Sequence, residues 1–208
     1  MDHDGAPARG RYIAFEGIEG AGKSTVADRV AHHLETQGHG VVRVREPGGT
    51  DVGEQIRGIL LDGDHAPVPR AEAALFAAAR AQLIAEKVVP ALEAGSWVLS
   101  DRSAYSSLAY QGGARGLGLE DIRLLNDIAI GGVWPDVVVL LRTNPNVGLS
   151  RQEVGDRIGN ESLAFHHTVS SAFDALAEQE PDRFVVVDAT APVRDVVRET
   201  LTALGVAP

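Results

Sequence analysis

A short segment near the N-terminus contains side chains that are suited to bind a chain of phosphates. The apolar run Tyr12–Glu16 leads into a glycine-rich stretch: Gly17, Ile18, Glu19, Gly20, Ala21, Gly22, Lys23, Ser24 and Thr25. Glycines let backbone N–H groups turn inward around an anion, because no Cβ stands in the way. The lysine supplies a charge for the β- and γ-phosphates of a nucleotide, and the serine hydroxyl is suited to Mg²⁺. Since a helical pattern follows at once, we predict a P-loop in which residues 17–25 bind the phosphates of a nucleotide.

Three further charged residues are candidates for binding Mg²⁺ or phosphate. Two of them stand at the end of a later apolar run, and the third lies in a helical pattern. Asp101 ends the run Trp97–Asp101 and is a candidate Mg²⁺ ligand, although an aspartate there could instead cap the next helix. Arg102 follows it, and the forked guanidinium group of an arginine suits phosphate oxygens. Arg80 lies in a helical pattern, where a solvated charge is the alternative interpretation.

Two loops have both a structural and a functional interpretation. The polar stretch 151–160 contains Asp156 and Arg157, and it is either a lid that closes over phosphates or an ordinary surface loop. The sequence Arg45–Thr50 forms a sharp turn after a strand, so its residues either serve the turn or contact a ligand.

Phe76 lies on the apolar face of a helix, where core packing is the simpler interpretation.

The histidines do not predict a metal site. The pairs His32-His33 and His166-His167 have no other metal-ligating residues at suitable spacing. We therefore predict that they are surface or capping residues.

The apolar runs that must position these residues alternate with helical patterns. Strands are predicted at Tyr12–Glu16, Val41–Arg45, Trp97–Asp101, Val137–Arg142 and Phe184–Asp188. Helices are predicted at 24–37, 50–61, 69–94, 103–111, 119–131, 161–179 and 192–204, with a kink or break at Pro90. This order predicts an α/β fold, with a five-stranded parallel sheet and helices on both of its faces. Ligands are then expected at the carboxyl ends of the strands.

Composition places limits on the class of protein. The chain has 208 residues, with 19 basic and 29 acidic side chains and a net charge of −10, which argues against a nucleic-acid binder. It has no cysteine, which excludes disulfides and thiolate metal sites. No apolar stretch approaches about 18 residues, so no membrane span is predicted and the cytoplasm is the default location. We predict a disordered tail at residues 1–10 and a single domain at 11–208, with a lid at about 150–160.

Several motifs occur together in the order and spacing of bacterial thymidylate kinases, which this chain resembles from about residue 11 to 205. They are Glu16–Ser24, Arg45–Thr50, Ala78–Gln82, Asp101-Arg102, Ser106–Gly112 and Asp156–Ile158. The P-loop alone is common to many proteins, whereas Glu-Pro-Gly-Gly-Thr together with Ser-Ser-Leu-Ala-Tyr-Gln-Gly is far more specific. The resemblance implies a P-loop NTPase fold, a homodimer packed through helices, and Mg²⁺-dependent transfer of the γ-phosphoryl group of ATP to dTMP.

The resemblance also implies roles for particular side chains. Phe76 would stack on thymine, Ser107 and Gln111 would lie near the base, and Tyr110 would lie beneath the deoxyribose and exclude a 2′-hydroxyl. Glu46 and Pro47 would shape the base pocket, and Glu19 would face the 3′-hydroxyl and the metal. Arg80 and Arg102 would hold the acceptor phosphate. Lys23 would act with the lid charges Arg151 and Arg157 on the transferring group, and Ser24 and Asp101 would hold Mg²⁺.

Some positions depart from the family pattern. Ala79 replaces the aspartate before Arg80, so we expect Arg80 to be less firmly oriented. Ser103 stands in place of a tyrosine, Arg142 in place of an aspartate, and the lid has few basic residues and an acidic Glu153. The P-loop has Ala21 where some members have an arginine, and Arg151 is the nearest substitute. These departures leave open a different pyrimidine deoxynucleotide as acceptor, or a nucleotide-binding protein without transfer activity.

Overall fold

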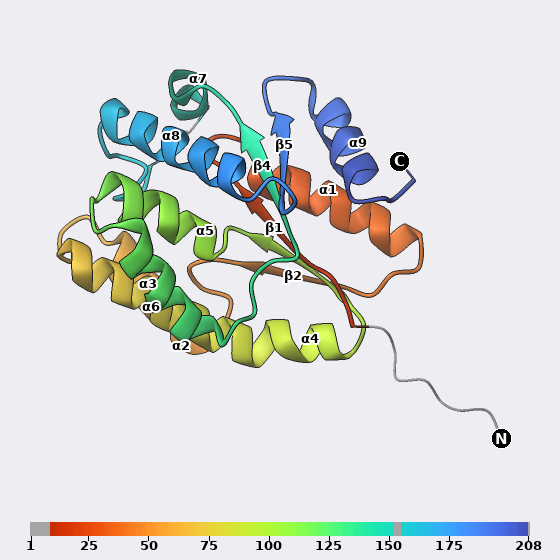
Figure 1. Cartoon of the computed structure of the whole chain (residues 1–208), viewed down its shortest axis with the longest axis horizontal. Coiled ribbons are helices and arrows are strands. Elements are labelled where there is room, and N and C mark those ends of the chain that lie inside the picture. Colours follow the sequence, from red (N-terminus) through yellow and green to blue (C-terminus); the bar gives the residue numbers. More distant parts are fainter. Residues whose placement is uncertain (1–8, 152–154, 208) are drawn as a thin grey trace.

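The computed structural model describes residues 9–151 and 155–207, and its centre is a parallel sheet of five strands (Figure 1). The strands are β1 (Tyr12–Glu16), β2 (Val41–Arg45), β3 (Trp97–Asp101), β4 (Val137–Arg142) and β5 (Phe184–Asp188). Their order is β2-β3-β1-β4-β5, and every neighbouring pair is parallel. The predicted strands and the predicted sheet are confirmed.

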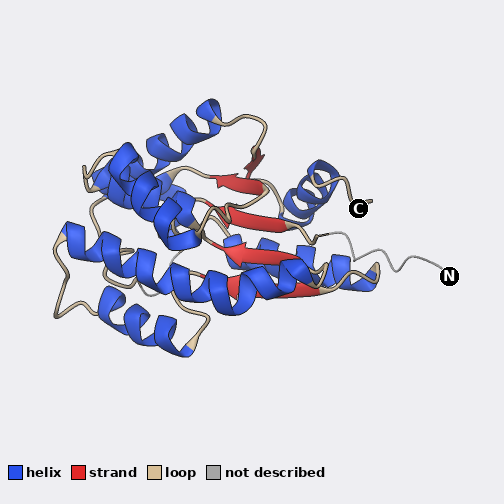
Figure 2. Cartoon of the chain, turned by 60° about the horizontal axis from the view of Figure 1, so that its bottom comes forward, coloured by secondary structure: helices blue, strands red, loops and turns tan. Residues whose placement is uncertain are grey.

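Helices cover both faces of the sheet, as predicted (Figure 2). On one face, Ile13 and Phe15 of β1 pack with α1 (Lys23–Thr36) and α9 (Val193–Ala203). On the other face, Val138 and Leu140 of β4 pack against a larger helical layer. That layer contains α3 (Pro69–Leu83), α4 (Val89–Glu93), α5 (Ala104–Ser107), α6 (Leu119–Ile130) and α8 (Leu163–Gln179), and α2 (Asp51–Leu61) packs on α3. Apolar burial on both sides explains why the inner strands β1, β3 and β4 are nearly continuous apolar runs, whereas the edge strand β2 has two exposed arginines.

The long helix predicted at 69–94 is interrupted. Between α3 and α4 the backbone forms a π-helical segment, Ile84–Val88, and Pro90 then lies in the first turn of α4. Proline has no N–H group and its ring crowds the carbonyl four residues earlier, so the hydrogen-bonding pattern must change just before it. A second π-helical segment, Leu108–Ala114, extends α5 and was not predicted as such.

One helix was missed by the sequence analysis. This is α7 (Pro145–Ser150), which follows β4 directly. The Asn144 side chain accepts a hydrogen bond from the Asn146 N–H group at 2.9 Å, and Pro145 takes the first helical position. An asparagine cap followed by proline is a helix-start signal, but no helix was predicted at this position.

The predicted tail, residues 1–10, lies mostly outside the described residues. Within them, Arg9 forms an ion pair with Asp136 at 3.0 Å, and the Gly10 N–H group donates to the Leu92 carbonyl. The chain is therefore attached to the domain from Arg9 onward. None of the helices in the described ranges combines the length and apolar character that crossing a membrane requires.

Candidate active site

The register of the sheet gathers the predicted site residues at one edge. Arg45 of β2 and Phe15 of β1 are both aligned with Asp101 of β3, so the carboxyl ends of the three strands meet there. The P-loop leaves β1 at this edge and enters α1. Gly17 and Gly20 have φ angles of 138° and 69°. A Cβ at Gly17 would lie 2.6 Å from the Leu141 carbonyl oxygen, so a side chain there would both strain the backbone and collide.

Lys23 turns back onto its own loop. Its ammonium group donates hydrogen bonds to the carbonyl oxygens of Gly17 at 3.1 Å and Ile18 at 2.8 Å. The side chain is buried, and this burial lowers the pKa of Lys23 to about 8. The lysine is therefore held at the centre of the loop, where a phosphate would meet it.

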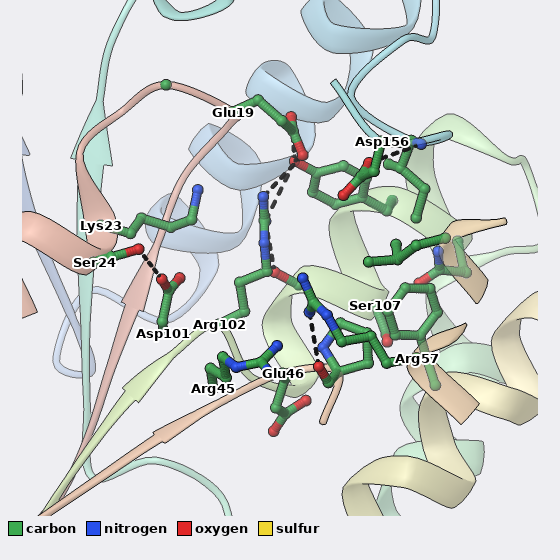
Figure 3. Close-up of a pocket in the computed structure, with 18 of the residues that line it drawn as sticks. Glu19, Lys23, Ser24, Arg45, Glu46, Arg57, Asp101, Arg102, Ser107 and Asp156 are labelled. Carbon is green, nitrogen blue, oxygen red and sulfur yellow. Dashed lines mark hydrogen bonds and ion pairs between the residues drawn. The ribbon is translucent and has the colours of Figure 1, made fainter. Parts of the chain in front are cut away.

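Ser24 and Asp101 supply adjacent oxygen atoms beside the lysine (Figure 3). The Ser24 hydroxyl donates a hydrogen bond to the Asp101 carboxylate, which links the start of α1 to the end of β3. A hydroxyl and a carboxylate are the hard oxygen donors that Mg²⁺ prefers, and Mg²⁺ normally takes only one or two protein ligands beside phosphates and water. The pair therefore fits the predicted metal site.

Glu19, Arg102 and Tyr110 form a network at the mouth of the P-loop. The Arg102 guanidinium donates to Glu19 at 2.8 Å and to the Tyr110 hydroxyl at 3.3 Å, and that hydroxyl donates to Glu19 at 2.8 Å. Burial alone would raise the pKa of Glu19, but the charge of Arg102, contacts with His166 and Tyr110, and the charge of Lys23 together hold it well below its usual range. Glu19 is thus an ionised carboxylate with a fixed orientation.

His166 contradicts its prediction as a surface or capping residue. Its side chain on α8 is fully buried, and Nδ1 lies 3.1 Å from the Glu19 carboxylate. His167, one position later, is exposed, as is His32. The helical spacing of Val169, Phe173 and Leu176 defines the buried face of α8, and this local pattern places His166, but not His167, on that face.

One cleft of about 460 Å³ runs from the P-loop to a partly apolar end. Lys23 and Ser24 line the first end, and the other end is lined by Pro47, Phe76, Ser107 and Gln111, among others. Phe76 packs within the core and also lines the cleft, so the two interpretations of this residue are compatible.

Arg80 is not among the residues that line this cleft, although a phosphate role was expected for it. Its guanidinium group is buried and donates to Glu46 at 2.6 Å, to Ser107 at 3.1 Å, to the Ser103 carbonyl at 3.1 Å and to the Asn126 side chain. The expectation that Ala79 leaves Arg80 loosely oriented is therefore wrong. Partners distant in sequence replace the missing aspartate. Burial raises the pKa of Glu46 to about 7, despite the opposing effect of Arg80.

Arginines near the middle of the cleft include one that the sequence analysis missed. Arg45, Arg57 and Arg102 all line the cleft, where Arg102 is paired with Glu19 and Arg45 donates to Glu54 at 2.9 Å. Arg57 of α2 also donates to the Pro47 carbonyl at 2.8 Å. The signal that could have identified Arg57 from the sequence is its position on the helix that directly follows the Arg45–Thr50 turn.

Some residues of the predicted lid line the cleft, and others do not. Arg151 and Asp156 line the cleft, whereas Arg157 donates to Glu72 at 2.6 Å and to the Leu60 carbonyl at 2.9 Å. The charge predicted at Glu153 lies outside the described residues. Arg151 also lines a second pocket of about 440 Å³ on the far side of the P-loop. That pocket is lined by Gly20, Ala21, Gly22, Thr25, Val26, Ala189, Ala191, Val193 and Val196.

Two other departures from the family pattern have structural explanations. The Ser103 hydroxyl donates to buried Glu16 at 2.7 Å and accepts the Tyr105 N–H group, so it caps α5. Arg142 forms an ion pair with Asp174 at 2.8 Å, and both side chains are largely exposed. Neither residue lines the main cleft.

The glycine-rich turn between β1 and α1, at the edge of a parallel sheet, defines a P-loop nucleotide-binding protein with two adjoining pockets. A family model described as thymidylate kinase matches residues 15–200. The chain belongs to the thymidylate kinase family. It is 47% identical over 199 residues to the thymidylate kinase of Halalkalibacterium halodurans, covering 93% of this chain and 95% of that protein. It is 45% identical over 201 residues to that of Bacillus pumilus, covering 94% and 95%, and 46% identical over 193 residues to that of Staphylococcus haemolyticus, covering 91% and 94%.

Proposed function

We propose that this protein transfers the γ-phosphoryl group of ATP to dTMP, giving ADP and dTDP. The observation that carries the proposal is the continuous cleft. It places a P-loop lysine at one end, arginines in the middle, and Phe76 with Gln111 at the other end. A donor phosphate chain and a nucleoside monophosphate can then meet in line between the two ends.

The donor nucleotide occupies the P-loop and the second pocket. Backbone N–H groups at the start of α1 and the Lys23 ammonium bind its phosphates. The apolar side chains of Ala189, Ala191 and Val193 accept the flat adenine base beside the loop. Arg151 lines both pockets and donates to the Ala189 carbonyl at 3.3 Å, so it lies between the base and the transferring group.

Ser24 and Asp101 would hold Mg²⁺, which neutralises charge on the β- and γ-phosphates when bound. Lys23, Arg102 and Arg151 supply the positive charge that this chain itself directs at the transferring group. The acceptor is already an anion, so transfer requires positioning and electrostatic stabilisation more than a strong base. Arg157 is anchored on Glu72, and we assign it to holding the 155–160 segment over the cleft.

The acceptor phosphate is bound by Arg45, Arg57 and Arg102, which line the middle of the cleft. Arg80 instead orients Ser107 and Glu46 from behind the base pocket. Phe76 stacks on the base, and Gln111 hydrogen-bonds to it. Tyr110 lies beneath the sugar and is fixed by Glu19 and Arg102, so a 2′-hydroxyl meets a ring that does not move aside.

We also propose a homodimer that forms through the layer of α2, α3 and α6. Val52 and Ile59 of α2 and Leu124 and Ile128 of α6 are exposed large apolar side chains of these helices. Both α2 and α6 pack on α3, and exposed apolar residues of this size on them suit a second copy of the chain. The cytoplasmic location stays a prediction of the sequence.

The test is ADP production from ATP and Mg²⁺ with dTMP, dUMP, dCMP and UMP in parallel. Turnover with dTMP well above the other acceptors, abolished in Lys23→Ala, is the expected result. A clear preference for another monophosphate would change the acceptor, and dTMP binding without any ADP would contradict the kinase assignment. The structural roles of Ser103 and Arg80 weaken the case for a different acceptor.

A further inference from the structure

Glu72 is a buried carboxylate behind the base end of the cleft. It lies on α3 and is 1% exposed. The Gln111 side-chain amide donates to it at 2.8 Å, Arg157 donates at 2.6 Å, and Arg115 donates at 3.2 and 3.3 Å. Of these partners only Gln111 also lines the cleft. Glu72 is therefore in contact with the base-binding surface through this one side chain.

The charge on Glu72 determines which end of the Gln111 amide faces it. Burial by itself raises the pKa of Glu72, but the hydrogen bonds from Gln111, Arg157 and Arg115 bring it below the usual range. An ionised carboxylate can only accept hydrogen bonds, so the amide must direct its NH₂ group toward Glu72. Amide orientation is often ambiguous, but here the chemistry of the partner fixes it.

The Gln111 carbonyl oxygen, Oε1, is the atom left for a ligand. No hydrogen bond between described residues engages Oε1. The side chain lines the cleft together with Phe76 and Ser107. Gln111 thus presents its acceptor oxygen to the edge of a base that stacks on Phe76.

Pyrimidine bases differ at the position that such an acceptor reads. Thymine and uracil carry a proton on N3, so this atom donates a hydrogen bond, whereas N3 of cytosine has a lone pair and can only accept; the donor of cytosine is its neighbouring 4-amino group. We propose that Glu72 is a positioning residue that locks the Gln111 amide and thereby makes the acceptor site select thymine or uracil over cytosine. This inference rests on the proposed function, because it requires the acceptor base to lie against Gln111. A buried acceptor facing another acceptor leaves both without a partner, which is strongly unfavourable.

The test compares the dissociation constants of dTMP and 5-methyl-dCMP, measured by calorimetry without ATP near neutral pH. Both ligands carry the 5-methyl group, so they differ only at the Watson–Crick edge. We expect the wild-type protein to prefer dTMP by about 100-fold or more. In Glu72→Gln the introduced amide can also donate, so Gln111 can turn over, and the preference should fall by about tenfold.

The matched control is Arg115→Gln. It removes one ion pair from Glu72 but leaves the contact between Glu72 and Gln111 in place. The preference for dTMP should stay within about twofold of wild type, even where the protein is less stable. An equal loss of preference in Glu72→Gln and Arg115→Gln would overturn the inference, because general loosening of the site would explain both.

A second measurement uses the wild-type protein and so does not depend on the folding of a variant. The ¹⁵N side-chain amide signal of Gln111, identified by its absence in Gln111→Leu, should exchange slowly with solvent before any ligand is added. Rapid exchange would overturn the inference, as would an unchanged dTMP preference in a folded Glu72→Gln. Absence of ADP production with intact, selective dTMP binding would instead refute only the kinase assignment.

Discussion

Replacing Arg80 by methionine tests the buried ion pair behind the base pocket. Arg80 and Glu46 have side chains that are each 2% exposed, and their nearest atoms are 2.6 Å apart. Methionine retains the apolar part of the side chain but leaves the Glu46 carboxylate without its partner. Breaking a buried pair from one side costs about 3–5 kcal/mol, because the remaining charge is no longer compensated. Ser107 and Asn126 also lose a hydrogen-bond partner.

The cost should depend on pH in a defined direction. The pKa of Glu46 is raised from 4.5 to about 7, mainly by burial, so the folded state binds the proton more tightly than the unfolded state. Stability from this group is therefore fully present below pH 4.5 and is lost as the pH rises through 7. Arg80 lowers the pKa of Glu46, so its removal raises this pKa further. In Arg80→Met the free energy of unfolding therefore continues to fall at pH values above 7. Each further pH unit costs about 1.4 kcal/mol, so the effect of Arg80→Met should be larger at a pH of about 8 than at about 6.

The assay is urea unfolding followed by circular dichroism at both pH values. Arg43→Met is the matched control, because Arg43 pairs with Glu35 at 2.9 Å but is 45% exposed. Its loss should be below about 1 kcal/mol, with no trend in pH. A loss in Arg80→Met no larger than that of the control, or one that is the same at both pH values, would refute the reasoning.

Three further outcomes are expected. Because the pKa of Lys23 is lowered to about 8 and a bound phosphate would raise it, ATP binding takes up a proton above that pH, and its Kd should rise about tenfold per pH unit. Calorimetry showing a constant Kd over two pH units above 8 would contradict this. Asp101→Asn should raise the Mg²⁺ concentration for half-maximal ADP production by about tenfold, and an unchanged value would remove Asp101 from the metal site. Ile128→Lys should convert a dimer to a monomer in size-exclusion chromatography with little change in melting temperature, whereas an unaltered elution volume would place the interface elsewhere.

The inner strands β1, β3 and β4 were predictable because each is a nearly continuous apolar run that is largely buried. The edge strand β2 was predictable from its valines, although its two arginines are exposed. The P-loop was predictable because its glycines and lysine act within a single local segment. In both cases the decisive information lies within a few consecutive residues.

The positions of individual side chains depend on contacts between distant segments. Arg80 is oriented by Glu46 and Asn126, which lie 34 and 46 positions away, so the neighbouring Ala79 gave the wrong expectation. Arg157 turns to Glu72, 85 positions away. No spacing rule within one segment contains this information.

The contacts that Lys23 makes with its own loop have a consequence for which anions the free protein can retain. The carbonyl oxygens of Gly17 and Ile18 act as internal competitors for the ammonium group. An anion that binds Lys23 must therefore form stronger interactions than the two hydrogen bonds that it replaces. A single inorganic phosphate replaces these hydrogen bonds with few additional contacts, whereas a triphosphate also reaches the N–H groups along the loop and the start of α1. The contacts of Lys23 with the loop carbonyls therefore favour binding of polyphosphates over that of simple anions.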